Sequence, residues 1–206
     1  MRGGGNTATR ESLDTEVSQI ENFVNAIRTA LIRMNLSNGY KLWQIDYSRS
    51  NYSAATANAT CTTAACKLFD ANGGGLSVPY VIPAKLLQSE SVCVANSGWA
   101  RNVWFTNISV KNVGIDNRRD LLLHLPAASD DLCKAVNRRY GVANGSIPDD
   151  APDWNIDYSG TLTGEIDLNY AAKLGDEEAT IAGKQMFCAR RPSDGCNIIW
   201  AVLYER

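Results

Sequence analysis

The sequence has one histidine, His124, among its 206 residues, and this scarcity limits the chemistry that the chain can perform. A serine or cysteine nucleophile would have to recruit His124, which lies in the apolar run 121–125, where a buried core histidine is the simpler interpretation. A phosphate-binding loop is missing too, because no lysine follows the glycine triplet 73–75, which we interpret as a flexible loop. We therefore predict that the protein is not an enzyme.

Long apolar runs and a surplus of basic charge are also missing. The longest apolar run, 198–204, has the length of a strand, whereas a bilayer span needs ~20 residues. The chain has 20 basic and 22 acidic residues and a formal net charge of -2. No basic face is strong enough to replace phosphate counterions, so we expect no nucleic-acid partner. A hydrophobic share of 45% is typical of a well-folded soluble protein.

Cysteine, in contrast, is well represented, and its number is even. The six cysteines are Cys61, Cys66, Cys93, Cys133, Cys188 and Cys196. An even set indicates three disulfides and an oxidising compartment, whereas a zinc site is disfavoured because no Cys-x-x-Cys pair exists. The spacings Cys61–Cys66 and Cys188–Cys196 could each close a small loop. Fifteen pairings are possible, and Cys61 with Cys66 is the pair that the spacing favours most.

A long amphipathic helix is the clearest element of the sequence. Its apolar positions recur in steps of three and four, at Leu13, Val17, Ile20, Val24, Ile27, Leu31 and Met34. We predict a helix over 12–38 that Ser12 caps and that Asn38-Gly39 ends. Residues 1–11 are interpreted as a non-native junction and a flexible start, so we expect the native amino end to be missing.

The rest of the chain, 39–206, predicts a single α+β globular head. Strand-like segments are expected at 42–45, 77–82, 102–113, 184–189 and 197–204, with Asp194-Gly195 turning the last two into a hairpin. The apolar segment 120–125 is expected to be a strand or a helix edge. Ser129 predicts the start of a second helix that Gly141 ends. The acidic, turn-rich stretch 143–176 is expected to be a long surface excursion.

Ligand sites are only weakly indicated. Asp149, Asp153 and Asp157 are candidates for calcium, although their spacing does not match an EF-hand, and no other cofactor is expected. Trp99, Trp104 or Trp154 could stack on a sugar, and Trp154 in the acidic stretch is the better candidate of the three.

The layout resembles a family, the soluble part of bacterial type IV pilin-like proteins, which includes the pseudopilins of type II secretion systems. The helix 13–34 resembles the half of the family's helix that packs on a sheet, and the segments 130–141 and 187–206 also look similar to parts of these proteins. The resemblance implies a long amino-terminal helix on an antiparallel sheet, a variable loop and a disulfide-stapled carboxy-terminal region. It also implies a basic leader, a methylated residue and an apolar membrane helix preceding this chain.

The resemblance implies a structural function. A major or minor subunit would assemble with other pilin-like subunits into a periplasmic or cell-surface filament, anchored in the inner membrane through the missing helix and serving secretion or adhesion. Subunit contacts are expected at the loop near Cys61 and the acidic loop near Trp154. The alternative is an exported, disulfide-bonded binding or adhesion module.

Overall fold

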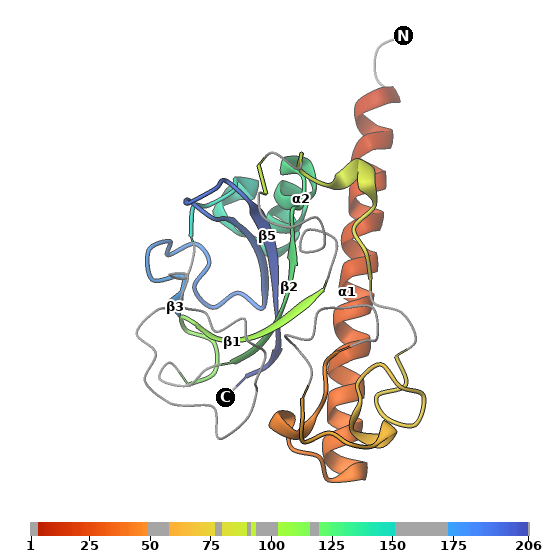
Figure 1. The fold of residues 1–206 in the computed structure, drawn as a ribbon. Coiled ribbons are helices and arrows are strands. Elements are labelled where there is room, and N and C mark those ends of the chain that lie inside the picture. Colours follow the sequence, from red (N-terminus) through yellow and green to blue (C-terminus); the bar gives the residue numbers. More distant parts are fainter. Residues whose placement is uncertain are drawn as a thin grey trace.

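A computed structural model describes residues 4–48, 58–76, 80–89, 92–93, 103–115, 120–150 and 173–205, with side chains from residue 10 onward. The fold is α+β, with a long helix, α1 (Gly4–Asn38), beside a curved sheet and a second helix, α2 (Asp130–Tyr140). Figure 1 shows α1 along one side of the molecule, with its first turns extending beyond α2 and the sheet. The expected long amino-terminal helix is therefore present.

Five strands form the sheet, in the order β3-β1-β2-β5-β4. Their bounds are β1 (Trp104–Val110), β2 (Asp120–Pro126), β3 (Lys173–Leu174), β4 (Met186–Arg190) and β5 (Asn197–Tyr204). The pairs β1/β2, β2/β5 and β4/β5 are antiparallel, as expected, but the short β3 runs parallel to β1. The sheet is thus mixed, and the expectation of a purely antiparallel sheet was wrong at this edge.

Each face of the sheet has its own apolar cluster, because successive strand residues point to opposite faces. Leu121, Leu123 and Ile199 face the layer formed by α1 and α2. Leu122 and Trp200 belong to the second cluster, on the opposite face. The strands are accordingly buried on both sides, which explains why the segment Asp120–Pro126 is buried throughout.

The capping signals of α2 operate as the sequence predicts. The Ser129 hydroxyl accepts a hydrogen bond from the Leu132 amide at 3.3 Å, and Gly141 ends the helix in the left-handed conformation, with φ +64°. Ser12, in contrast, lies inside α1, which begins at Gly4. The prediction that Ser12 caps this helix was therefore wrong, since a strong apolar stripe does not itself mark where a helix starts.

Two predicted strands are not strands in the described residues. Leu42–Gln44 form a short 3₁₀ turn, in which the Ile45 amide donates to the Leu42 carbonyl at 3.3 Å. Leu42 and Ile45 are both buried, and apolar residues three apart satisfy a helical turn as well as a strand. In the segment predicted as 77–82, only residues 80–82 are described, and they form no strand.

Candidate interaction surface

The predicted packing stripe of α1 is buried along its whole length. Leu13, Val17, Ile20, Val24, Ile27, Leu31 and Met34 are each exposed by 7% or less. They join one cluster with residues of the sheet and α2. The stripe fixes which face of α1 meets the head and which face is left for solvent or a partner.

Polar side chains of α1 tie it to three other parts of the chain. The hydroxyl of Tyr80 donates to the carboxylate of the buried Glu16, and burial together with this bond raises the pKa of Tyr80. Arg28 donates through Nε to the Val202 carbonyl of β5 at 3.0 Å. Arg33 donates through Nη2 to the Gly74 carbonyl at 2.6 Å. These anchors join α1 to the rest of the head along its length.

The solvent-facing side of α1 changes character along the helix. Arg10, Glu11 and Asp14 are exposed near its start, so this part is charged. From Asn22 to Asn38, Arg33 is the one exposed charged residue, and its guanidinium is held by loop carbonyls. The exposed residues of this second half are Asn22, Asn25, Ala26, Thr29, Ile32, Arg33, Leu36, Ser37 and Asn38. Ile32 and Leu36 are apolar and exposed by 55% and 78%, so a partner could bury apolar surface here.

The loop near Cys61, where we expect subunit contacts, is built onto the carboxy-terminal end of α1 (Figure 1). Asn58 organises it, because its amide nitrogen donates to the Trp43 carbonyl at 2.7 Å and its oxygen accepts from the Thr60 amide at 3.0 Å. The predicted disulfide Cys61–Cys66 is present. Thr62 and Thr63, between the two cysteines, are exposed and form the outer side of this loop.

The glycine triplet, which the sequence analysis interprets as a flexible loop, forms a tightly packed turn, and its flexibility stays a prediction. A β-carbon on Gly73 would lie 2.1 Å from the Lys67 carbonyl oxygen, and one on Gly74 would lie 2.1 Å from that of Leu68. Only glycine allows the backbone to approach so closely. The triplet therefore packs the 58–76 segment against itself and presents two carbonyls to Arg33.

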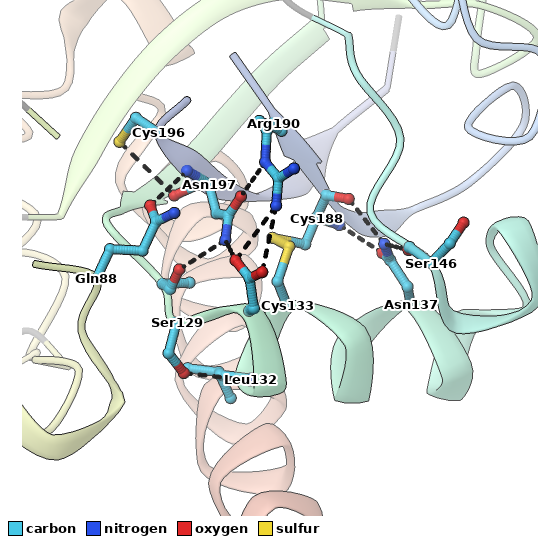
Figure 2. Close-up of a disulfide and its surroundings, with 12 residues drawn as sticks. Gln88, Ser129, Leu132, Cys133, Asn137, Ser146, Cys188, Arg190, Cys196 and Asn197 are labelled. Atoms are coloured by element: carbon cyan, nitrogen blue, oxygen red, sulfur yellow. Dashed lines mark hydrogen bonds and ion pairs between the residues drawn. A yellow bond between two sulfur atoms is a disulfide. The ribbon is translucent and has the colours of Figure 1, made fainter. Parts of the chain in front are cut away.

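The carboxy-terminal region is stapled by Cys133–Cys188, which joins α2 to β4 (Figure 2). Beside it, the buried Asn137 extends the ladder of β4, since its oxygen accepts from the Cys188 amide at 2.8 Å and its nitrogen donates to the Cys188 carbonyl at 2.9 Å. The same nitrogen donates to the Ser146 carbonyl at 2.6 Å. Asn137 thus satisfies the outward-facing backbone groups of Cys188, while those of Arg190 pair with the backbone of Pro148 and Asp150.

The third disulfide, Cys93–Cys196, attaches residues 92–93 to the β4–β5 hairpin. Gln88 supports this contact by accepting from the Asn197 amide at 2.7 Å (Figure 2). The suggested Cys188–Cys196 loop is not formed, because Cys188 belongs to the α1-facing cluster and Cys196 to the cluster on the opposite face. Sequence proximity across a hairpin did not reveal that the two sulfurs point to different layers.

His124 is fully buried in β2, in keeping with the core histidine that the sequence favours. Its ring lies between Trp104 and Trp200, with centroid distances of 6.5 and 4.8 Å. Burial, with a smaller contribution from the charge of Arg191, lowers its pKa to about 3. The ring is therefore neutral at physiological pH and packs as part of an aromatic row across the sheet.

The calcium and tryptophan candidates are only partly placed. Asp149 is exposed, whereas Asp153, Asp157, Trp99 and Trp154 lie outside the described residues. The described part of the chain contains no group of three or more His, Cys, Asp or Glu residues that could hold a metal ion.

Asp150, which the sequence did not single out, is the buried carboxyl of the acidic stretch and accepts from the Gly175 amide at 2.7 Å. Burial raises its pKa to about 6, and the charges of Asp176, Glu177 and Glu178 add to this effect against the Gly175 hydrogen bond. Its sequence neighbour Asp149 looks equivalent in the sequence, so only the fold distinguishes the two.

A polar groove of about 300 Å³ opens between α1, the end of α2 and the start of β4. Its walls are Glu21, Asn22, Val24, Asn25, Arg28, Tyr140, Gln185 and Met186. No sequence pattern predicts this groove, because its residues come from three distant segments. The polar spacing of Glu21, Asn25 and Arg28 along one flank of α1 was the only signal available.

No family model, curated protein or solved structure matches this chain. None of the helices among the described residues combines the length and the apolar character that crossing a bilayer requires.

Proposed function

We propose that the protein is a structural subunit of a bacterial filament of the type IV pilin or type II secretion pseudopilin kind. The observation that carries this proposal is the form of α1. The helix has 35 residues, about 50 Å at 1.5 Å per residue, but its buried stripe begins only at Leu13. Its first turns extend beyond the head (Figure 1), as a helix does when it reaches toward other subunits.

The disulfides and the surface of α1 support the same proposal. Three disulfides are typical of a protein that matures in an oxidising compartment such as the periplasm. The second half of α1 exposes Ile32 and Leu36 on a side whose one exposed charged residue, Arg33, is held by loop carbonyls. In a filament, a neighbouring subunit would cover these apolar side chains and gain roughly 25 cal/mol per Å² of apolar area.

The proposal is tested by placing a charge on this surface. The double variant Ile32→Glu/Leu36→Glu, expressed from the complete gene in its own host, is expected to disappear from sheared surface filaments. Its melting temperature should stay within a few degrees of the wild type, because both side chains are exposed. The matched control is Gln19→Glu, an exposed position in the charged half of α1, which should assemble normally. A double variant that is recovered in filaments at wild-type level would contradict the proposed contact.

A second candidate function is an exported binding module, and the polar groove is the observation that favours it. The two candidates differ in a simple property. A binding module is stabilised by its ligand, whereas a filament subunit shows no ligand-dependent shift in melting temperature.

A further inference from the structure

The groove between α1, α2 and β4 has walls that are already held in place by the protein's own hydrogen bonds. Glu21 accepts from Arg139 Nη2 at 2.9 Å and from the Tyr140 hydroxyl at 3.0 Å. Burial and this bond to Glu21 raise the pKa of Tyr140 to about 12, so the hydroxyl stays protonated. Arg28 is fixed by the Val202 carbonyl at 3.0 Å and by Gln185 Oε1 at 3.5 Å. A ligand would therefore meet a preformed surface, which lowers the entropic cost of binding.

The charge of Arg28 is not neutralised by a carboxylate. Its hydrogen-bond acceptors are the Val202 carbonyl and the side-chain oxygens of Asn25 and Gln185, which are all neutral. In the part of the chain that the structure describes, no carboxylate lies within ion-pair distance of this guanidinium. Glu21 is the groove's own carboxylate, and its partner is Arg139. The groove thus contains one cation that lacks an anion.

Two amides beside this cation have unused hydrogen-bonding atoms. The Asn22 side chain makes no hydrogen bond to any described residue, and the Asn25 side chain uses only its oxygen, which accepts from Arg28 Nη1 at 3.3 Å. Nη1 carries a second hydrogen beyond the one given to Asn25. A guanidinium N–H and the amide N–H groups of Asn22 and Asn25 therefore line the same groove.

We propose that this groove binds a sugar that carries a carboxylate, a compound of the uronic-acid class. The carboxylate would accept from Arg28 Nη1 and Asn25 Nδ2, as charge-assisted hydrogen bonds favour. Ring hydroxyls, which both donate and accept, match the amide of Asn22. Gln185 is already engaged, because its Oε1 accepts from Arg28 and its Nε2 donates to Glu205. The side chains of Val24 and Met186 form an apolar part of the wall, against which the ring carbons would pack. The volume of the groove, about 300 Å³, accommodates one sugar residue.

The test is a titration of the ¹⁵N-labelled chain, residues 1–206, with sodium glucuronate, followed by NMR. We expect saturable shifts of the Asn22 and Asn25 side-chain amides and of Arg28 Nε–H, with a dissociation constant of about 1 mM or tighter. Glucose lacks the carboxylate and sodium acetate lacks the hydroxyls, so each should bind roughly tenfold more weakly. A tetramer of uronates that binds more tightly than the monomer at the same residues assigns a polysaccharide as the source, and equal affinity assigns the free sugar acid.

Matched variants separate the groove from general charge effects. Asn25→Asp places a negative charge beside the expected carboxylate and should weaken glucuronate binding at least tenfold. Ser37→Asp adds the same charge to the exposed side of α1, about 18 Å along the helix from Asn25, at a residue that does not line the groove. It should retain affinity within roughly twofold, because that distance exceeds the Debye length. Arg28 is left intact, because it holds β5.

Three results would overturn the inference: no saturable shift with glucuronate, equal affinity for acetate, or equal losses in the two variants. This inference rests on the second candidate function, an exported binding module, because a filament subunit is expected to show no ligand-dependent stabilisation. Its failure and the failure of the filament proposal are distinguishable, since the titration uses the isolated chain and the filament assay uses no sugar.

Discussion

Two regions of the molecule are closed by disulfides in different ways. Cys133–Cys188 joins α2 to β4 across 55 residues of sequence, and both cysteines are fully buried. Cys61–Cys66 closes a loop of only 5 residues at the end of α1. Because the entropy removed from the unfolded chain grows with loop length, the first bond stabilises the whole fold, whereas the second shapes one local turn. The carboxy-terminal region should therefore be the rigid part and the 58–76 segment the adaptable part.

The largest expected effect is the loss of the α2–β4 bond. The double variant Cys133→Ala/Cys188→Ala should lower the free energy of unfolding by about 4 kcal/mol, the value for a loop of this length in the chain-entropy model. Urea denaturation under non-reducing conditions measures it. A loss below about 1 kcal/mol would show that packing alone holds α2 on the sheet.

Asn137 should be nearly as important in the same region. Asn137→Ala removes the partner of the Cys188 amide and carbonyl and of the Ser146 carbonyl, so we expect a loss of about 3 kcal/mol, roughly 1 per hydrogen bond. Denaturation of the variant with its disulfides intact gives the value. The exposed Asn72→Ala is the control, and equal stability of the two variants would contradict the assigned role.

Asp150 provides a pH-dependent test at the edge of β4. Because burial raises its pKa to about 6, its protonated form is favoured in the folded state. The associated stability is present below the unfolded pKa of ~4 and is lost as the pH rises through 6. Asp150→Asn should therefore stabilise the protein by about 2 to 3 kcal/mol at pH 8 and by little at pH 4.

Denaturation curves at pH 4, 6 and 8 provide this measurement, with the exposed neighbour Asp149→Asn as the matched control. Because Asp149 is exposed, the control is expected to change the free energy of unfolding by less than about 0.5 kcal/mol. If Asp150→Asn raised the free energy of unfolding equally at pH 4 and pH 8, ionisation of the Asp150 carboxyl would not be the cause of the stabilisation.

The short disulfide should matter less. Cys61→Ser/Cys66→Ser is expected to lower the free energy of unfolding by about 2 kcal/mol, half the value for Cys133–Cys188. Hydrogen exchange should show faster opening confined to residues 58–76. If exchange increased equally in α2 and β4, the proposed contrast between the two regions would be lost.

The smallest effect is expected from the contact between α1 and the glycine turn. Arg33→Met removes the donors to the Gly73 and Gly74 carbonyls, at 3.1 and 2.6 Å, but keeps an apolar stem. The loss should be about 1 kcal/mol, because the carbonyls can turn to water. Faster amide exchange of residues 73–76, with an unchanged β-sheet, is the expected signature, and unchanged exchange there would contradict it.

The sequence predicts local elements of this fold better than its long-range contacts. The α1 stripe, the Ser129 cap, the Gly141 stop and the β4–β5 hairpin follow from spacing and turn chemistry within a few residues. The parallel β3 and the bonds Cys133–Cys188 and Cys93–Cys196 depend on segments far apart in the chain. The spacing of residues along the chain does not predict such contacts. It also suggested a Cys188–Cys196 disulfide, which does not form because the two cysteines lie in clusters on opposite faces of the sheet.

The candidate surface shows the same limit. The apolar spacing predicts the packed side of α1, whereas the exposure of Ile32 and Leu36 is a finding of the structure. The walls of the groove include Tyr140 and Gln185, which come from parts of the chain far from α1. Asp150 is buried and Asp149 is exposed, although the two look alike in the sequence. A local sequence pattern does not predict features that form only when distant segments of the chain pack together.

The central claim, that the protein is a filament subunit, is tested most directly by locating it on the cell. An antibody raised against the chain, used with immunogold electron microscopy on the organism that carries the gene, should label filaments along their length or at their tips. The protein should also be lost from filaments in the Ile32→Glu/Leu36→Glu strain. Recovery of the wild-type protein only as a monodisperse species in the periplasm or the medium would contradict the account.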